Sequence, residues 1–363
     1  MIPLKTDCRH FRGDLPCRPH KQFRVHCVDE RGSLCPHYDR VSTRLLIIKL
    51  GALGDVIRTT PLLLPLRRAH PHAAMYWLTY TPEILPRQVD HPLGFTLQNL
   101  TLLRSLRFDA VYNLDKDPEA CALCNQINAR RKKGFILRKG KPAPAGRAAE
   151  HKFLTGIFDD VSRANTKSYL EEVFEICGFT FAGEEYQMDP PFHHSSRWRL
   201  SPKRKVIGLN TGCGSRWTSR LWAEERWAAL ARRLKKSGYE VVLLGGEQEH
   251  AKNRRLAKTS GAKYFGHFPL MEFIDLVNRC DLVVTGVTMA LHVAIALRKK
   301  VVLMNNIFNK HEFELYGRGL IVEPVRPCTC FYQPTCTNPE YRCMDHLTVE
   351  QIVAACTSLL PRS

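Results

Sequence analysis

The chain has 363 residues, with 54 Lys and Arg against 35 Asp and Glu, and a formal net charge of +19. This length allows two α/β domains, and the basic excess favours anionic partners such as nucleic acid, lipid headgroups or phosphorylated small molecules. No apolar run is long enough to span a bilayer, and the N-terminus lacks the apolar core of a signal peptide. We therefore expect a cytoplasmic protein that touches a membrane face by charge.

Eight of the fourteen cysteines fall in two clusters. Without an export signal, clustered thiols suggest a bound metal rather than disulfides. The first 42 residues are rich in Cys and His and too short to form a core, so we expect structural zinc there, with an iron–sulfur cluster or no metal as alternatives. Neither cluster has the paired C-x2-C spacing of common zinc sites. The candidate ligands are Cys8, Cys17, Cys27 and Cys35 in the first cluster and Cys328, Cys330, Cys336 and Cys343 in the second.

The region from Leu45 to about Pro190 alternates strand and helix patterns, which predicts a parallel sheet with right-handed crossovers. Apolar and β-branched runs predict its strands, and helical spacing of apolar residues predicts its helices. The expected strands are 45–49, 74–80 and 110–114, and the expected helices are 61–69, 118–129 and 169–177.

A glycine turn follows the first strand and carries Lys49 and Asp55. Open α/β sheets bind ligands beyond the carboxyl ends of their strands, so this turn is a candidate site. A local ion pair or a helix cap explains the same two residues without chemistry. The turn alone does not decide between these readings.

A basic run lies between Arg130 and Lys141. It is either a solvated loop or a surface that receives an acidic acceptor or membrane face. The acceptor-binding candidates in this run are Arg130, Arg131, Lys132 and Lys133.

A polar, proline-bounded stretch at 190–202 is typical of an interdomain linker, and a second α/β pattern follows it. We expect a second Rossmann-like domain, with a cleft between the two domains at the carboxyl ends of their strands. Its expected strands are 206–210, 240–244, 282–285 and 300–304, and its expected helices are 223–236, 249–259, 271–279 and 289–297.

Three loops of the second half have features of nucleotide binding. The first is glycine-rich and basic, so its backbone N–H groups and arginines can hold a diphosphate. Glu249 follows the next strand, where a carboxylate can accept hydrogen bonds from ribose hydroxyls. His292 lies in the first turn of an apolar helix. It is either a buried core residue or a functional residue that donates a proton or contacts a phosphate. The first loop contributes Thr211, Gly212, Gly214, Ser215, Arg216 and Arg220.

From about residue 43 onward the chain resembles the family 9 glycosyltransferases, the heptosyltransferases of the lipopolysaccharide inner core. The resemblance begins with IIKLGALGDVIRTTPLL at 47–63 and continues, in order, through Arg220-Leu221-Trp222, the LLGG turn, the segment ending in His292 and the Cys343-Met344 tail. Thr288 and His292 match the family's D-T-G-x-x-H element, whereas Val287 and Met289 replace its Asp and Gly. Arg220 stands where lysine is more usual.

The resemblance implies a GT-B fold: an acceptor domain at 43–195 and a nucleotide-sugar domain at 196–363, preceded by the cysteine-rich extension at 1–42. It implies inverting transfer of a heptose-like sugar, typically from an ADP-linked donor, to a saccharide or lipid-linked acceptor at the inner membrane. Asp55 would be the general base. Lys49, Arg216 and Arg220 would stabilise the leaving diphosphate without a metal ion or other catalytic cofactor. The alternative is a degenerate transferase that binds nucleic acid or an anionic envelope polymer, although the basic residues lack the interleaved aromatics of single-strand binders.

Overall fold

The computed structural model describes residues 3–190 and 197–361, so the predicted linker at 190–202 lies partly outside the described residues. The chain divides into two compact units. The first contains residues 1–51, 62–149 and 176–179, and the second contains 52–61, 150–175 and 180–363. In the described ranges, no helix has the length and apolar character needed to cross a membrane.

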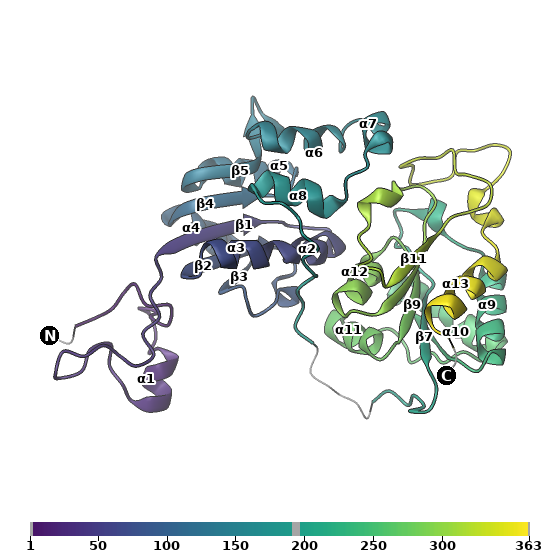
Figure 1. The fold of residues 1–363 in the computed structure, drawn as a ribbon, viewed down its shortest axis with the longest axis horizontal. Helices are drawn as coiled ribbons and strands as arrows, with labels where there is room; N and C mark the ends of the chain where they lie inside the picture. The colour runs from purple at the N-terminus through teal and green to yellow at the C-terminus, as the bar shows by residue number, and fades with distance from the viewer. Residues whose placement is uncertain (1–2, 191–196, 362–363) are drawn as a thin grey trace. The chain divides into compact units, whose positions relative to one another are not determined.

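The first unit is built on a six-stranded sheet of order β3-β2-β1-β4-β5-β6 (Figure 1). The pairs among β1 to β5 are parallel, and β6 is antiparallel to β5. The predicted alternation of strands and helices is confirmed. The strands are β1 (Thr43–Ile48), β2 (Ala73–Thr79), β3 (His91–Gly94), β4 (Arg107–Asn113), β5 (Asn128–Arg138) and β6 (Lys141–Pro144), and the helices include α3 (Leu63–Ala69), α4 (Leu97–Ser105) and α5 (Pro118–Gln126).

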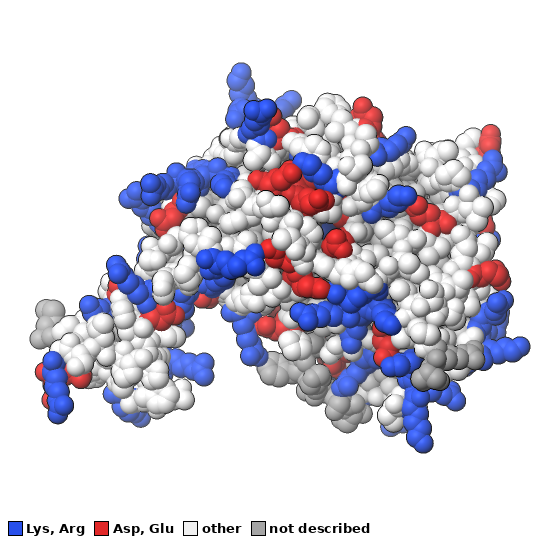
Figure 2. Space-filling model, viewed as in Figure 1, with Lys and Arg blue, Asp and Glu red and all other residues white. Residues whose placement is uncertain are grey.

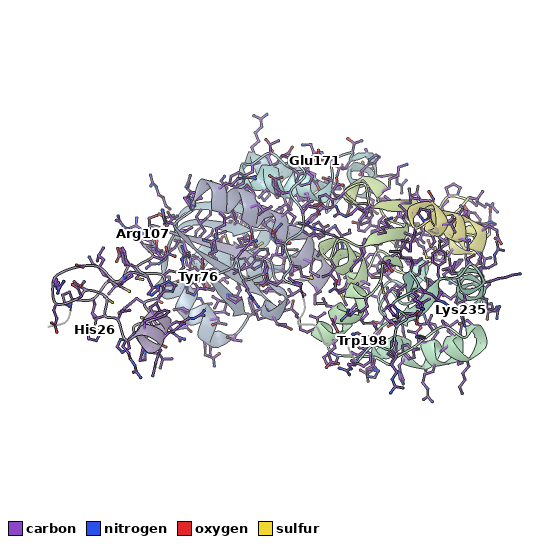
Figure 3. The ribbon with its side chains drawn as sticks, turned by 60° about the horizontal axis from the view of Figure 1, so that its bottom comes forward. His26, Tyr76, Arg107, Glu171, Trp198 and Lys235 are labelled. Atoms are coloured by element: carbon purple, nitrogen blue, oxygen red, sulfur yellow. The ribbon has the colours of Figure 1, made fainter. Side chains whose placement is uncertain are left out.

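The core of the first unit lies against its central strands. Leu46 and Ile48 of β1 are fully buried with Leu78 of β2 and Val111 of β4. Tyr76, labelled in Figure 3, stacks on a neighbouring histidine ring with centroids 4.1 Å apart. These apolar strands are buried on both faces, as central parallel strands usually are.

The basic run at 130–141 is not a loop, as one reading of the sequence had it, but most of strand β5 and the start of β6. Charge composition says nothing about backbone pairing, and long basic side chains can reach solvent from a paired strand. Successive residues point to opposite faces of a sheet, so Arg130 and Arg131 do not share a face. On the side of the molecule seen in Figure 2, Lys and Arg are interspersed with Asp and Glu.

The second unit has a five-stranded parallel sheet of order β11-β10-β9-β7-β8 (Figure 1). Its core includes Trp222, Trp227, Leu243 and Val284. The second Rossmann-like pattern is confirmed. The strands are β7 (Val206–Asn210), β8 (Glu240–Leu244), β9 (Leu282–Gly286), β10 (Lys300–Met304) and β11 (Gly319–Val322), and the helices include α9 (Glu224–Lys236), α10 (His250–Ser260), α11 (Leu270–Asn278), α12 (Met289–Ala296) and α13 (Val349–Leu359).

Segments from the first half of the sequence also belong to the second unit. Helix α2 (Leu53–Thr59), which the sequence analysis did not predict, is one of them, together with α6 (Glu150–Leu154), α7 (Asp159–Ala164) and most of α8 (Tyr169–Cys177). The glycines at 51 and 54 suggested a turn through this stretch, but Gly54 is helical. The predicted helix at 61–69 is shorter, beginning at Leu63 after a 3₁₀ turn.

Candidate active site

Helix α2 packs against α12 at Gly54, where an added side chain would force His292 to shift. A Cβ at this position would lie 2.6 Å from Cδ2 of His292, closer than Cβ atoms approach other atoms in proteins. His292 is 5% exposed, and the Tyr186 hydroxyl lies 3.5 Å from its Nδ1. Burial, together with the nearby Arg58 cation, lowers the pKa of His292 to about 3. His292 is therefore a neutral imidazole that fixes α2 on α12.

Asp55 lies one residue further along α2 and forms an ion pair with Arg58, with Oδ1 and Nε 2.9 Å apart. Arg58 Nη1 is also 3.7 Å from Oε2 of Glu312, and its guanidinium lies 3.5 Å from the centroid of the Tyr169 ring. Burial disfavours the charge of Arg58, but Asp55 and Glu312 outweigh burial and raise its pKa. The Asp55 side chain stays 33% exposed, so its carboxylate is held in place yet reaches solvent.

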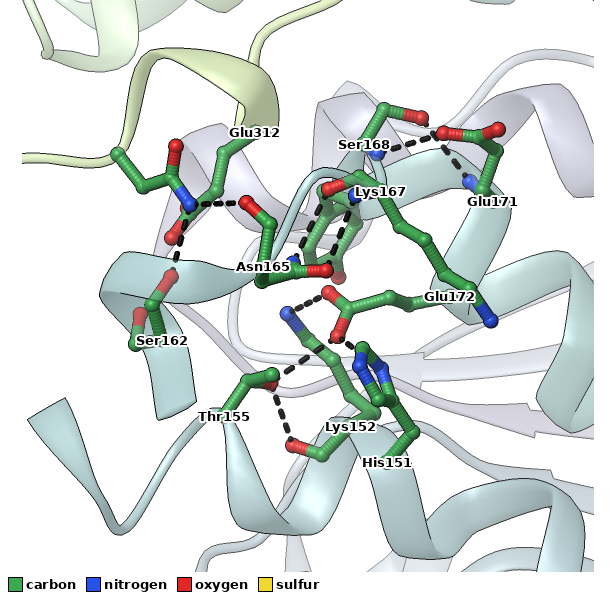
Figure 4. A network of polar contacts seen from close by, with 12 residues as sticks. His151, Lys152, Thr155, Ser162, Asn165, Lys167, Ser168, Glu171, Glu172 and Glu312 are labelled. Carbon is green, nitrogen blue, oxygen red and sulfur yellow. Dashed lines mark hydrogen bonds and ion pairs between the residues drawn. The ribbon is translucent and has the colours of Figure 1, made fainter. Parts of the chain in front are cut away.

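A polar network surrounds Glu172 (Figure 4). Glu172 Oε2 accepts a hydrogen bond from Lys152 at 2.6 Å, and Oε1 lies 3.1 Å from His151 Nδ1 and 3.0 Å from the Thr155 hydroxyl. Lys152 also lies 4.9 Å from the Tyr169 ring centroid. A buried carboxylate with three partners is well satisfied and rigid.

The loop after β7 is tied to the loop after β9 by Asn210. Its Nδ2 donates to the Thr285 hydroxyl at 3.0 Å, the Thr288 hydroxyl at 3.2 Å and the Gly212 carbonyl at 3.2 Å. Thr211 is buried and donates to Asn253 Oδ1 at 2.6 Å. Two of the predicted nucleotide loops are thus brought together at the carboxyl ends of adjacent strands.

Arg220 is buried beside this loop. It donates to the backbone carbonyls of Val287 and Cys213, and its guanidinium lies 5.2 Å from the centroid of the Phe308 ring and 5.7 Å from that of Trp217. Its Nε has no hydrogen-bond partner, and in the described part of the chain no carboxylate pairs with it. Burial lowers the pKa of Arg220 to about 10, so it remains a cation at neutral pH.

Glu249 lies against Gly212, where a Cβ would come within 2.1 Å of its carboxyl carbon, and it accepts a hydrogen bond from the Gly246 N–H at 3.0 Å. Lys252 is half-buried nearby and donates to the Thr211 carbonyl at 2.8 Å. Burial lowers the pKa of Lys252. Glu249 therefore supports the loop, and Lys252 adds a second cation to it.

The tip of the loop is exposed. Gly214 has φ +72°, a left-handed conformation that favours glycine, and no atom lies within 4 Å of a Cβ built there. Ser215 and Arg216 are exposed, and the Arg216 guanidinium lies 5.2 Å from the centroid of the Trp217 ring.

The cysteine-rich tail supports the other end of the loop. Ser219 donates from its N–H to the Pro334 carbonyl and from its hydroxyl to the Gln333 carbonyl, at 3.0 and 2.8 Å. Asn306 Nδ2 donates both to the Ser219 carbonyl and to Cys343 Sγ. A hydrogen bond from the Cys328 thiol, with the Asn306 amide, lowers the pKa of Cys343 to about 6.

Neither cysteine cluster forms a single-ion site. Cys330 Sγ and Cys336 Sγ are 3.8 Å apart, but across residues 3–190 and 197–361 no three His, Cys, Asp or Glu side chains gather as ligands of one metal ion. The expected zinc sites are thus unsupported by this arrangement.

The first unit holds the remaining predicted residues. Lys49 forms an ion pair with buried Asp115, whose Oδ1 lies 3.3 Å from the Lys49 Nζ. The local ion pair with Asp55 that the sequence suggested is therefore not needed to explain Lys49. Lys133 donates to the Cys177 carbonyl at the end of α8, and Lys132 donates to the Asn125 carbonyl. Arg130 and Arg131 are exposed.

Sequence reasoning missed several residues of this site. Arg58 had a usable signal, because it follows Asp55 by three residues and a helix places such pairs together. The signal for Lys252 was weaker, and nothing in the sequence pointed to Tyr169, Tyr186 or Glu312, whose contacts with α2 or α12 arise only from the tertiary fold.

Two Rossmann-like units, with a carboxylate near the start of helix α2 and a cationic loop after β7, are typical of the GT-B fold. The family model described as glycosyltransferase family 9 (heptosyltransferase) matches residues 101–318. The chain therefore belongs to glycosyltransferase family 9, as its sequence resemblance implied.

Individual relatives agree with this assignment. Lipopolysaccharide heptosyltransferase 2 of Salmonella typhimurium is 31% identical over 116 residues, so the match covers 30% of this chain and about a third of that protein (33%). A family 9 glycosyltransferase structure from Veillonella parvula matches with TM-score 0.68 and 20% identity, covering 89% of this chain and 98% of that one. The structure of E. coli ADP-heptose lipopolysaccharide heptosyltransferase II matches with TM-score 0.64 and 17% identity, covering 87% and 98%. These structures confirm the GT-B fold.

Proposed function

We propose that this protein transfers a heptose-like sugar from an ADP-linked donor to a saccharide acceptor of the lipopolysaccharide-core type, with inversion at the anomeric carbon. Membership of family 9 supports the reaction class. The matched E. coli structure is named for ADP-heptose, and we extend that donor to this chain as part of the proposal.

The observation that carries the proposal is the buried Arg220 guanidinium. A buried cation without a carboxylate partner is costly, and a bound anion would relieve that cost. The planar guanidinium, the Lys252 ammonium and the nearby loop N–H groups suit the two phosphates of a nucleoside diphosphate. Val287 stands where the family has an acid, and its backbone carbonyl accepts a hydrogen bond from the Arg220 guanidinium.

Asp55 is the proposed general base. Its carboxylate takes the proton of an acceptor hydroxyl while that oxygen forms a bond to the anomeric carbon. The bond from the anomeric carbon to the diphosphate oxygen breaks on the opposite face, and ADP leaves. Arg220 and Lys252 stabilise the charge that develops on the diphosphate, so the proposed mechanism needs no catalytic metal.

We assign the acceptor to the first unit, with either Arg130 or Arg131, exposed residues on opposite faces of β5, as the contact for an anionic saccharide or lipid-linked acceptor. This assignment rests on their charge and exposure. It also accommodates an acceptor presented at the cytoplasmic face of the inner membrane.

Calorimetric titration with ADP tests the donor site. Replacing Arg220 with Met should weaken ADP binding about tenfold to a hundredfold, because a charge-assisted hydrogen bond contributes about 1.5–3 kcal/mol. Arg204→Met is the matched control: Arg204 is exposed in the same unit, so its loss changes net charge equally and should leave ADP affinity nearly unchanged.

Thermal-shift measurements with ADP-, UDP- and GDP-sugars and with short oligonucleotides test the wider proposal. We expect the ADP-sugar to raise the melting temperature. In a separate product analysis, we expect transfer of its sugar to a core saccharide. Stabilisation by oligonucleotides alone, falling steeply with added salt, would instead support the binding-protein alternative.

A further inference from the structure

A chain of side-chain contacts runs from Asp55 to the cysteine-rich tail, and all of its members belong to the second unit. Arg58 forms ion pairs with Asp55 at 2.9 Å and with Oε2 of Glu312 at 3.7 Å. Glu312, labelled in Figure 4, ends the 3₁₀ turn Lys310–Glu312, and its Oε1 accepts a hydrogen bond from the Tyr332 hydroxyl at 3.1 Å. The side chains of Arg58 and Glu312 are only 13% and 10% exposed, so solvent screens these contacts weakly.

The ring of Tyr332 lies among the aromatic side chains next to Arg220. Its centroid is 5.1 Å from that of Phe308 and 6.2 Å from that of Trp217, and both pairs are edge to face. The Phe308 and Trp217 centroids are 5.5 Å apart, so the three rings form one cluster. Aromatic pairs in this geometry stabilise one another beyond the effect of burial. Because the Arg220 guanidinium lies 5.2 Å from Phe308 and 5.7 Å from Trp217, Tyr332 supports the rings beside that cation.

The backbone of Tyr332 has a conformation that is unusual for tyrosine. Its φ of +55° falls in the left-handed region, which disfavours residues with a Cβ. Its N–H donates to the carbonyl of Ile307, a fully buried residue, at 3.0 Å. A conformation of this kind persists only where the surrounding structure holds it, and such residues are common at functional sites. The contacts of the hydroxyl, the ring and the N–H together fix Tyr332 in place.

We propose that Tyr332 is a positioning residue for both the base and the diphosphate site, an inference that rests on the function proposed above. Its hydroxyl holds Glu312, which holds Arg58 and thereby sets the direction of the Asp55 carboxylate. Its ring holds Phe308 and Trp217 beside Arg220 and thereby shapes the diphosphate site. Tyr332 acts through these neighbours, so its hydroxyl should govern turnover and its ring should govern ADP affinity.

Tyr332→Phe in the full-length protein tests the hydroxyl, because it removes the hydrogen bond to Glu312 and keeps the ring. Misplacing a reacting group by about 1 Å can lower a rate about a hundredfold, so we expect kcat to fall about tenfold to a hundredfold. The Kd for ADP should change less than about twofold, because the ring remains. An unchanged kcat would overturn the proposal.

Tyr341→Phe is the matched control for loss of a hydroxyl. Tyr341 lies in the same tail, and its hydroxyl donates to the Pro327 carbonyl at 2.7 Å. This variant should keep kcat nearly unchanged. A fall in kcat equal to that of Tyr332→Phe would attribute the effect to a general loosening of the tail and refute positioning by Tyr332.

Calorimetric titration with ADP separates positioning from loss of fold. If Tyr332→Phe only misplaces the base, it should still bind about one ADP per chain. A stoichiometry that falls in proportion to kcat would show partial unfolding and refute positioning. In a Glu312→Ala background the hydroxyl has no carboxylate to hold, so Tyr332→Phe should lower kcat by no more than about a further twofold. A further loss of about tenfold or more would show that the hydroxyl acts by another route, against the proposal.

Tyr332→Leu tests the ring. Relative to Tyr332→Phe, it should weaken ADP binding about twofold to tenfold through loss of the aromatic pairs. Equal ADP affinities of the two variants would refute the role of the ring. Wild-type protein that transfers no sugar would overturn the proposed function and this inference together, whereas normal transfer by wild type and by Tyr332→Phe would overturn this inference alone.

Discussion

The contact between Gly54 and His292 predicts that the effect of Gly54→Ala on stability depends on the residue at position 292. The substitution should destabilise the protein when His292 is present and stabilise it when His292 is replaced by Ala. In Gly54→Ala the new Cβ would lie 2.6 Å from Cδ2 of His292, about 0.8 Å short of the 3.4 Å where ordinary contact begins. Overpacking of this kind costs about 1–3 kcal/mol, whereas Ala in place of Gly favours a helix by about 1 kcal/mol. We therefore expect Gly54→Ala to lower the free energy of unfolding by up to about 2 kcal/mol.

A double-mutant cycle isolates this contact. In a His292→Ala background the Cβ has space, so Gly54→Ala should raise stability by up to about 1 kcal/mol through helix propensity. Urea unfolding of the four proteins gives the coupling energy, expected to be about 1–3 kcal/mol. A coupling within about 0.5 kcal/mol of zero would refute the inference that His292 sets the distance between α2 and α12.

Two further predictions concern α2 and its partner helix. Asp55→Asn should leave ADP affinity nearly unchanged but lower turnover at least about a hundredfold, because the proposed base is lost. Near-normal turnover would show that another group acts as the base. His292 has its pKa lowered to about 3 by burial, so between that value and its ordinary 6.5 only the unfolded chain binds the proton. Stability should therefore fall as pH drops below 6.5, by up to about 1.4 kcal/mol per pH unit. His292→Gln should remove this part of the slope between pH 7 and 5, and an unchanged slope would contradict the burial of a neutral imidazole.

Much of the fold could be predicted from local pattern. Apolar runs such as Val206–Asn210 predict buried parallel strands without knowledge of the strands that pair with them, because such strands are covered on both faces and are apolar throughout. Strand β5 was missed because residues 130–133 within it are all basic, whereas its pairing with β4 depends on the backbone. Helix α2 was missed because two glycines in five residues suggest a turn, and the helix depends on its packing against α12.

The site was predictable only in part for a related reason. Glycine loops and charged residues are visible in sequence, but their partners are not. Arg220 could be assigned to a phosphate-binding loop, yet its burial without a carboxylate emerges only in three dimensions. Glu249 was expected to meet a ribose, and its contact with Gly212 gives it a supporting position within the protein.

The packing of α2 changes how the proposed catalytic groups are related. The sequence places Asp55 just after the first strand of the acceptor domain, and this suggests that base and donor site belong to different domains. In the structure residues 52–61 belong to the second unit, where Gly54 meets His292 and Arg58 meets Glu312. Asp55 is therefore positioned by the same unit that carries Arg220 and the loop after β7. Substitutions at the α2 contact with α12 should consequently alter turnover through the position of Asp55, while ADP affinity, which we propose depends on Arg220 and Lys252, stays nearly constant.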